Sequence, residues 1–211
     1  MLITLDRAAI GAGLAAPVPA LTLAAGPGVS VVAVETAERP LLVSMLAGGR
    51  LRPDSGRVLV DGRDDDDALR AGSALVDTPV VAEPTAGIAL ATIVTEEFSF
   101  AGIPTAHGAV RAFLEAHELR GYAKLPVRSL PPADRVRLFS ELALLRAGVR
   151  GLIITSPERH GGEPAAWYSA LAAIASRGIT VIVVTDAVTA ATLTSLGATD
   201  AALVSSPKEA P

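Results

Sequence analysis

The chain has 211 residues, a net charge of -4 and a pI of about 5.4, and half of its residues are hydrophobic while only 3% are aromatic. This length allows one α/β domain with a sizeable core, which must consist mainly of Ala, Val, Leu and Ile. The acidic balance argues against nucleic-acid binding, and the absence of cysteine excludes disulfides and thiolate metal sites.

The first third of the chain has the pattern of short strands and one helix. Residues 8–34 carry no charge, but three prolines and four glycines interrupt them, so we predict no membrane span. The run Val29–Val34 is apolar throughout, as in a strand buried on both faces. A turn-like segment, 35–38, separates it from a helix with proline in its first turn. The predicted elements are strands at Leu2–Leu5, Ala20–Leu23, Val29–Val34 and Arg57–Val60, and a helix at Arg39–Leu46.

The middle of the chain is predicted to be more helical, and the end alternates strand and helix as parallel sheets do. The four acids Asp64–Asp67 lack the glycine and closing glutamate of a calcium loop, so we expect a solvated loop. The predicted helices are Ile93–Ala101, Gly108–Leu119, Asp134–Arg146, Pro164–Ser176 and Val188–Leu196, and the strands are Leu152–Ile154, Ile179–Val184 and Ala201–Val204. In the helix Asp134–Arg146, Arg135 and Arg137 fall off the apolar stripe.

One stretch carries a resemblance to a known family. Met45–Gly48, followed by Arg52–Gly62, resembles the segment after the phosphate loop in the nucleotide-binding domains of ATP-binding cassette (ABC) transporters. The resemblance continues in order along nearly the whole chain. It implies an α/β fold: a P-loop NTPase-like, mostly parallel sheet flanked by helices, with a small antiparallel β subdomain and a helical subdomain. We therefore expect one domain over residues 1–211, with a helical insertion at about 84–147.

In the family, the phosphate loop has the pattern G-x-x-x-x-G-K-[ST], which supplies backbone N–H groups, a lysine charge and a Mg²⁺-binding hydroxyl. The matching positions here lack both glycines, and arginine and proline replace the lysine and the hydroxyl residue. Two glutamates add negative charge where a phosphate would bind. These positions are Ala33, Val34, Glu35, Thr36, Ala37, Glu38, Arg39 and Pro40.

The other family motifs are altered in the same way. Thr78 stands where the family has the glutamine that senses Mg²⁺ and contacts the permease, and Asp186 stands in place of the switch histidine. Thr155 and Ser156 replace the Mg²⁺-holding aspartate and the catalytic glutamate, so hydroxyls take the place of a general base. The counterpart of the LSGGQ signature is Leu130, Pro131, Pro132, Ala133 and Asp134.

These replacements predict a non-catalytic pseudo-ATPase with no catalytic residue, no metal and no cofactor. Its expected partners are a membrane permease, an intact ABC ATPase or both, and its expected place is the cytoplasmic face of the cell membrane. Two alternatives stay open. One is an ABC subunit that still binds ATP and Mg²⁺ or hydrolyses ATP slowly, and the other is a free-standing soluble scaffold.

Several other residues have side chains that could form a site. His107, His117 and His160 have no partner at metal-ligand spacing, and we expect no function for them. Ser156, His160 and Asp186 could suggest a hydrolase triad, but the G-x-S-x-G turn is missing.

We also expect Trp167 and Tyr168 to be packing residues. Arg39 faces a site without a phosphate, so we predict that it pairs with Glu35, Glu38 or Asp186.

Overall fold

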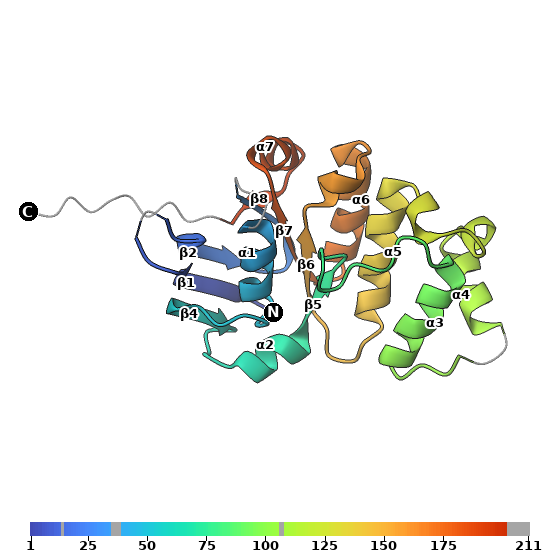
Figure 1. The fold of residues 1–211 in the computed structure, drawn as a ribbon, viewed down its shortest axis with the longest axis horizontal. Helices are drawn as coiled ribbons and strands as arrows, with labels where there is room; N and C mark the ends of the chain where they lie inside the picture. The colour runs from blue at the N-terminus through green and yellow to red at the C-terminus, as the bar shows by residue number, and fades with distance from the viewer. Residues whose placement is uncertain (14, 35–38, 106–107, 202–211) are drawn as a thin grey trace, which may run out of the picture.

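The computed structural model describes residues 1–13, 15–34, 39–105 and 108–201. The described residues form a five-stranded sheet and a three-stranded sheet, with helices on both sides of the larger one (Figure 1). The larger sheet has the order β5-β6-β7-β3-β8, and each neighbouring pair in it is parallel. Its strands are β3 (Gly28–Ala33), β5 (Ser73–Val76), β6 (Gly151–Thr155), β7 (Thr180–Thr185) and β8 (Thr199–Asp200).

The parallel sheet is buried on both faces because its central strands are apolar at every second position on each side. Val181 and Val183 of β7 pack into one core, while Ile182 and Val184 pack into the other. The first core also contains side chains of the helices from α3 to α7, and the second contains those of α1 and of the smaller sheet. Helices α3, α4 and α5 therefore share a continuous core with one face of the sheet.

The smaller sheet is antiparallel, with the order β2-β1-β4, and its strands are β1 (Ile3–Ile10), β2 (Val18–Ala25) and β4 (Ser55–Val60). Its register shifts near Arg7, which has a φ of 50°. Gly56 lies against this irregularity, and an added Cβ would come within 2.1 Å of the Arg7 carbonyl oxygen. Only glycine permits strands β1 and β4 to approach so closely at this point.

The helices lie in two groups (Figure 1). Helix α1 lies beside the antiparallel sheet, and α5 and α6 lie on the opposite side of the parallel sheet, with α3 and α4 beyond them. The helices are α1 (Arg39–Ala47), α2 (Asp66–Gly72), α3 (Leu90–Phe100), α4 (Ala109–Ala116), α5 (Pro132–Leu144), α6 (Pro164–Ala175) and α7 (Ala187–Ser195), and the short 3-10 helices are η1 (Arg120–Tyr122), η2 (Val127–Ser129) and η3 (Pro157–His160). Among the described residues, no helix has the length and apolar character needed to cross a membrane.

The predicted α/β fold class is confirmed, and two local predictions need correction. Strand β1 extends to Ile10, beyond the predicted end at Leu5. The acidic run is not simply a loop: Asp65 caps α2 by accepting a hydrogen bond from the Ala68 amide, and Asp66 and Asp67 form the first turn. Aspartates suit this place because they satisfy the free N–H groups and the helix dipole.

The predicted last strand lies mostly outside the described residues. Strand β8 precedes it, at Thr199–Asp200, and the Ala201 amide still bonds the Val31 carbonyl at 2.9 Å. The turn-like segment predicted at 35–38 also lies outside the described residues.

Candidate functional site

The carboxyl ends of parallel strands meet at one edge of a sheet, which is where α/β proteins build their sites. Here that edge joins the segments after β5, β6 and β7 with the start of α1. Thr78, Thr155, Ser156 and Asp186 all follow or end these strands, so the fold brings the sequence-predicted positions to one place. Asp77 and Ser156 adopt left-handed φ values of 50° and 45°, and such strain in non-glycine residues often marks functional sites.

A chain of buried hydroxyl groups crosses this edge. Thr155 donates to the Ser44 hydroxyl of α1 at 2.8 Å, and its oxygen lies 2.9 Å from that of Thr78. All three side chains are fully buried. The interaction links β5, β6 and α1 and satisfies three hydroxyls that would otherwise be buried without partners. Thr155 therefore has a structural role here, because its hydroxyl connects β6 to β5 and α1.

A buried ion pair lies beside the hydroxyl chain. Asp77 follows β5, and its two carboxylate oxygens each accept a hydrogen bond from Arg135 of α5 at 2.7 Å. Both side chains are only 5% exposed. A bidentate pair of this kind is strong because two N–H groups on one side of the planar guanidinium each bond one carboxylate oxygen. Arg135 also lies over the ring of Phe139, with its guanidinium carbon 5.3 Å from the ring centre.

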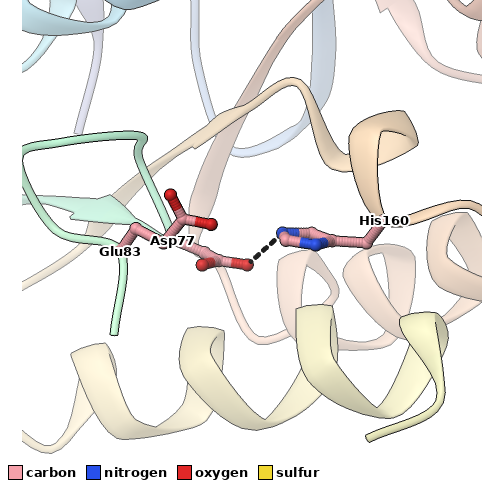
Figure 2. Close-up of side chains that lie close together, drawn as sticks. All are labelled: Asp77, Glu83 and His160. Atoms are coloured by element: carbon pink, nitrogen blue, oxygen red, sulfur yellow. Dashed lines mark ion pairs between the residues drawn. The ribbon is translucent and has the colours of Figure 1, made fainter. Parts of the chain in front are cut away.

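Three further charged or titratable groups complete the cluster. Arg159 of η3 lies 3.2 Å from Asp77 and 3.5 Å from Glu83, and it donates to the backbone carbonyls of Asp77, Thr155 and Ser156. His160 approaches Asp77 from the other side, with Nε2 at 2.9 Å from Oδ2 (Figure 2). The contact is short but lacks hydrogen-bond geometry, since that nitrogen has no hydrogen-bond partner among the described residues.

Asp77, Glu83 and His160 place one ligand atom each within 4.8 Å of one another, which is close enough for a metal ion (Figure 2). Two guanidinium groups argue against a metal there. Arg135 occupies both oxygens of Asp77, and Arg135 and Arg159 lie 3.9 and 3.5 Å from Glu83. The two carboxylates are already balanced by two positive charges, so a divalent cation would add uncompensated charge. The arrangement fits an ion-pair network.

The electrostatics of Asp77 reflect this balance. Burial by itself would raise the pKa of Asp77, because the charged form loses its hydration. The contacts with His160 and Arg135, together with the charge of Arg159, outweigh burial and hold the pKa of Asp77 below its ordinary value. Asp77 is therefore ionised in the folded protein at neutral pH.

The phosphate-loop positions are only partly described. Glu35, Thr36, Ala37 and Glu38 lie outside the described residues, so the predicted pairing of Arg39 with either glutamate is not tested. Of the three acids considered as its partner, Asp186 is not bonded to Arg39. Arg39 begins α1 and donates from Nε to the Pro17 carbonyl at 3.1 Å, which directs it toward the antiparallel sheet.

Asp186 is instead used as a helix cap. Its carboxylate accepts hydrogen bonds from the Thr189 amide at 2.8 Å and the Thr189 hydroxyl at 2.9 Å, at the start of α7. The bond from the Thr189 amide is the main cause of a lowered Asp186 pKa. A capped carboxylate is already satisfied, which is why it does not extend toward Arg39.

The segment matching the signature motif begins α5. Leu130 is buried, Pro131 is the N-cap, and Pro132 and Ala133 begin the helix. Asp134 pairs with Arg137 one turn later at 2.9 Å. The proline-rich start of α5 is thus a regular helix N-terminus, and its second turn delivers Arg135 to Asp77.

Several residues of this site did not stand out in the sequence. The apolar pattern of α5 placed Arg135 off the stripe, yet the structure buries it against Asp77. Asp77 is adjacent to the predicted Thr78, and Arg159 lies in the short segment after β6. No sequence motif marks either residue as part of a site. Glu158 also lies at the sheet edge, where its carboxylate accepts a hydrogen bond from Thr185 at 2.6 Å. Partners so far apart in sequence could be identified only from the fold.

The histidines and aromatic residues follow the sequence expectations in part. His117 is the C-cap residue of α4 and packs on Phe113, and burial is the first cause of its lowered pKa. His107 lies outside the described residues. Trp167 is fully buried in the core, as predicted, and Tyr168 is partly buried against it.

A groove of about 730 Å³ lies between the segment after β5 and helices α3 and α5, and Asp77 is one of the residues that line it. Its walls include Val81, Ile88 and Phe100, which are all exposed apolar side chains. Phe100, at the end of α3, is 74% exposed. Exposed aromatic and aliphatic side chains gathered around a groove are typical of protein-binding surfaces.

Comparison with solved structures shows a known fold. The chain is similar to a nucleotide-free ATP-binding cassette from an ABC transporter, with 14% identity and a TM-score of 0.66 over 89% of this chain and 82% of the other. It is also similar to cbiO1 from Clostridium perfringens, part of the ABC transporter complex cbiONQ, with 16% identity and a TM-score of 0.60 over 87% and 78%. A dimeric bacterial ABC transporter cassette matches with 17% identity and a TM-score of 0.62 over 90% of both chains.

No protein-family model matches the chain, and no curated protein matches it in sequence. The chain therefore has the fold of the ABC transporter cassettes at a sequence identity too low to transfer their activity.

Proposed function

We propose that this protein is a non-catalytic ABC-type subunit that acts as a structural or regulatory partner of a membrane permease, an intact ABC ATPase, or both. The main support is the carboxyl edge of the parallel sheet. Thr155, which ends β6 at the position of the Mg²⁺-holding aspartate, is neutral, buried and bonded to Ser44 and Thr78. A hydroxyl engaged in this way offers neither the charge nor the exposure that a Mg²⁺ ion needs.

The residues around the phosphate position also fit ATP poorly. Arg39 bonds the Pro17 carbonyl, and Pro40 has no hydroxyl for a metal. Each missing charge-assisted contact loses about 1.5–3 kcal/mol of binding. Losing two or three of them weakens binding by roughly a thousandfold or more. We expect Mg-ATP to bind weakly or not at all, with no hydrolysis.

Titration calorimetry of the purified chain with Mg-ATP tests this proposal directly. We expect no heat of binding at micromolar ATP and no thermal stabilisation by millimolar Mg-ATP. A dissociation constant in the low micromolar range or below would contradict the proposal. It would favour the alternative of an ATP-binding subunit.

One observation bears on that alternative. The Glu158 carboxylate lies at the sheet edge beside Thr185, and it is the kind of group that can accept a proton from water. If the chain hydrolyses ATP, Glu158→Gln should abolish the activity. If activity is present and survives that change, a different group supplies the base.

The groove beside Asp77 is the surface we propose for the permease. In the resembling family, the position of Thr78 contacts the permease, and here Thr78 opens the segment that forms one wall of the groove. The exposed Val81 and Phe100 would be covered by a cytoplasmic helix of the partner with an apolar face. Burying such side chains contributes about 25 cal/mol per Å² of apolar area.

A pull-down from native membrane extract tests the partner. We expect the tagged chain to retain a multi-span membrane protein, and Phe100→Glu to abolish its retention. Val188→Glu is the matched control, because Val188 is also an exposed apolar residue, at 79%, but lies on α7. If both variants still retain the membrane protein, the contact lies elsewhere on the chain. If the unmodified chain retains no protein, the free-standing scaffold is favoured.

A further inference from the structure

Residues 77–83 form the first loop between β5 and α3, and the two acids at its ends contact the same two arginines. Asp77 forms the start of the loop and contacts Arg135 and Arg159 at 2.7 and 3.2 Å. Glu83, six residues later, contacts the same arginines at 3.9 and 3.5 Å. Arg159 also bonds the backbone carbonyl of Asp77. We refer to Asp77, Glu83, Arg135 and Arg159 as the ionic staple.

The loop between these two anchors has an unusual conformation. Val80 has a φ of 65° and is 94% exposed, although a β-branched residue strongly disfavours this φ. Next to it, Val81 lines the groove and is also exposed. Two amides form backbone hydrogen bonds within this turn: the Val81 amide donates to the Pro79 and Thr78 carbonyls, and the Ala82 amide donates to the Thr78 carbonyl. Such strain persists only where the surroundings hold it in place.

We propose that the ionic staple holds residues 77–83 in this strained turn and so keeps Val80 and Val81 displayed beside the groove without any nucleotide. The two arginines come from η3 and α5, which contact strands β7 and β5 of the parallel sheet, so the loop is attached to the sheet through them. The docking face is then preformed in the isolated chain. The docking part of this inference rests on the proposed function, while the staple itself does not.

Hydrogen exchange of the isolated chain, followed by mass spectrometry or NMR, tests the staple. The first variant is Glu83→Gln, which weakens one anchor near the surface without leaving a buried charge unpaired. We expect the Val81 and Ala82 amides to exchange about tenfold faster or more, while amides of β6 and β7 keep their protection. The second variant, Asp77→Asn, should speed exchange of these amides further.

The control is Glu115→Gln, which removes the exposed partner of Arg120 at 3.1 Å in the same helical insertion. It should leave exchange of the loop unchanged. Equal exchange of the Val81 and Ala82 amides in wild type and Glu83→Gln would overturn the proposal, whether or not Asp77→Asn folds. Addition of Mg-ATP to the wild type should change nothing in this segment.

Two results distinguish the ionic staple from a metal site and from the proposed permease contact. A rise in melting temperature with Zn²⁺ that His160→Ala abolishes would show that Asp77, Glu83 and His160 hold a metal, and would overturn the staple. Faster loop exchange in Glu83→Gln together with an unbound permease would support the staple and contradict only the proposed partner.

Discussion

Two carboxylate–arginine pairs in this molecule have similar N–O distances and very different surroundings. Asp77 and Arg135 meet at 2.7 Å with both side chains 5% exposed, while Asp6 and Arg57 meet at 2.9 Å with side chains 36% and 59% exposed. The first pair joins α5 to the end of β5, and the second lies on the surface of the antiparallel sheet. The distance between two charges therefore says little about their role until burial is known.

The difference follows from hydration. When an exposed pair forms, each charged group replaces contacts with water by a contact with its partner. Salt and water screen the attraction, so the pair contributes little to the free energy of unfolding. A buried pair has lost its water, so the removal of one partner leaves the other charged and unsatisfied. The antiparallel sheet is held mainly by its apolar core, which includes Ile3, Leu5 and Leu23. The sheet edge at β5 depends on polar contacts, and variants in the two regions should respond differently.

The largest effect is expected from Asp77→Asn. This change leaves Arg135 buried with a weakened partner, and we expect a loss of about 3–5 kcal/mol in the free energy of unfolding. Urea denaturation monitored by circular dichroism measures it. Asp6→Asn is the matched control and should leave the urea midpoint nearly unchanged. Equal losses in both variants would remove the distinction between the two regions.

Acid should expose the same contrast without mutation. The pKa of Asp77 is lowered in the folded protein relative to about 3.9 in the unfolded chain. The Asp77 contribution to stability is therefore fully present above about pH 4 and is lost as the pH falls through the folded pKa. The groups that face this carboxylate are Arg135, Arg159 and His160, with Glu83 nearby.

Urea midpoints measured between about pH 2 and pH 7 test this expectation. The acid side of the profile should be flatter in Asp77→Asn than in the wild type, and Asp6→Asn should change it less. Parallel profiles for Asp77→Asn and wild type would mean that other carboxylates cause the acid sensitivity.

A smaller loss is expected where the sheet edge uses neutral groups. Thr155→Val keeps the side-chain shape but removes the hydroxyl that joins Ser44 and Thr78. We expect a loss of about 1–3 kcal/mol, because two buried hydroxyls lose a partner. Thr192→Val is the control, since its hydroxyl bonds only the Val188 carbonyl on the exposed side of α7. Similar thermal midpoints for both variants would contradict the role of the hydroxyl chain.

The smallest effect concerns the cap of α7. Asp186→Ala removes the acceptor of the Thr189 amide and should cost about 1 kcal/mol, whereas Asp186→Asn should cost a few tenths. Chemical denaturation of the three proteins measures the difference. Equal stability of Asp186→Ala and wild type would show that Asp186 is not used as a cap.

Much of the fold could be predicted because the hydrophobic pattern is local and regular. The apolar runs at 29–34 and 179–184 predicted β3 and β7, and the stripe of Val136, Phe139 and Leu142 predicted α5. The end of β1 was placed too early, and the start of α2 was predicted to be a loop, because a bulge and a helix cap depend on individual contacts.

The sequence by itself determined the α/β class, the order of most elements and the residue types at the sheet edge, because periodicity and chain order are properties of neighbouring residues. Only the tertiary structure decided the partner of each charged group. Arg39 bonds the Pro17 carbonyl, and Asp186 caps the helix that follows it. Arg135 bonds Asp77, which is 58 residues away in the sequence. A charged side chain takes the acceptor that packing brings within reach at the least loss of hydration, and that acceptor is set by the whole fold.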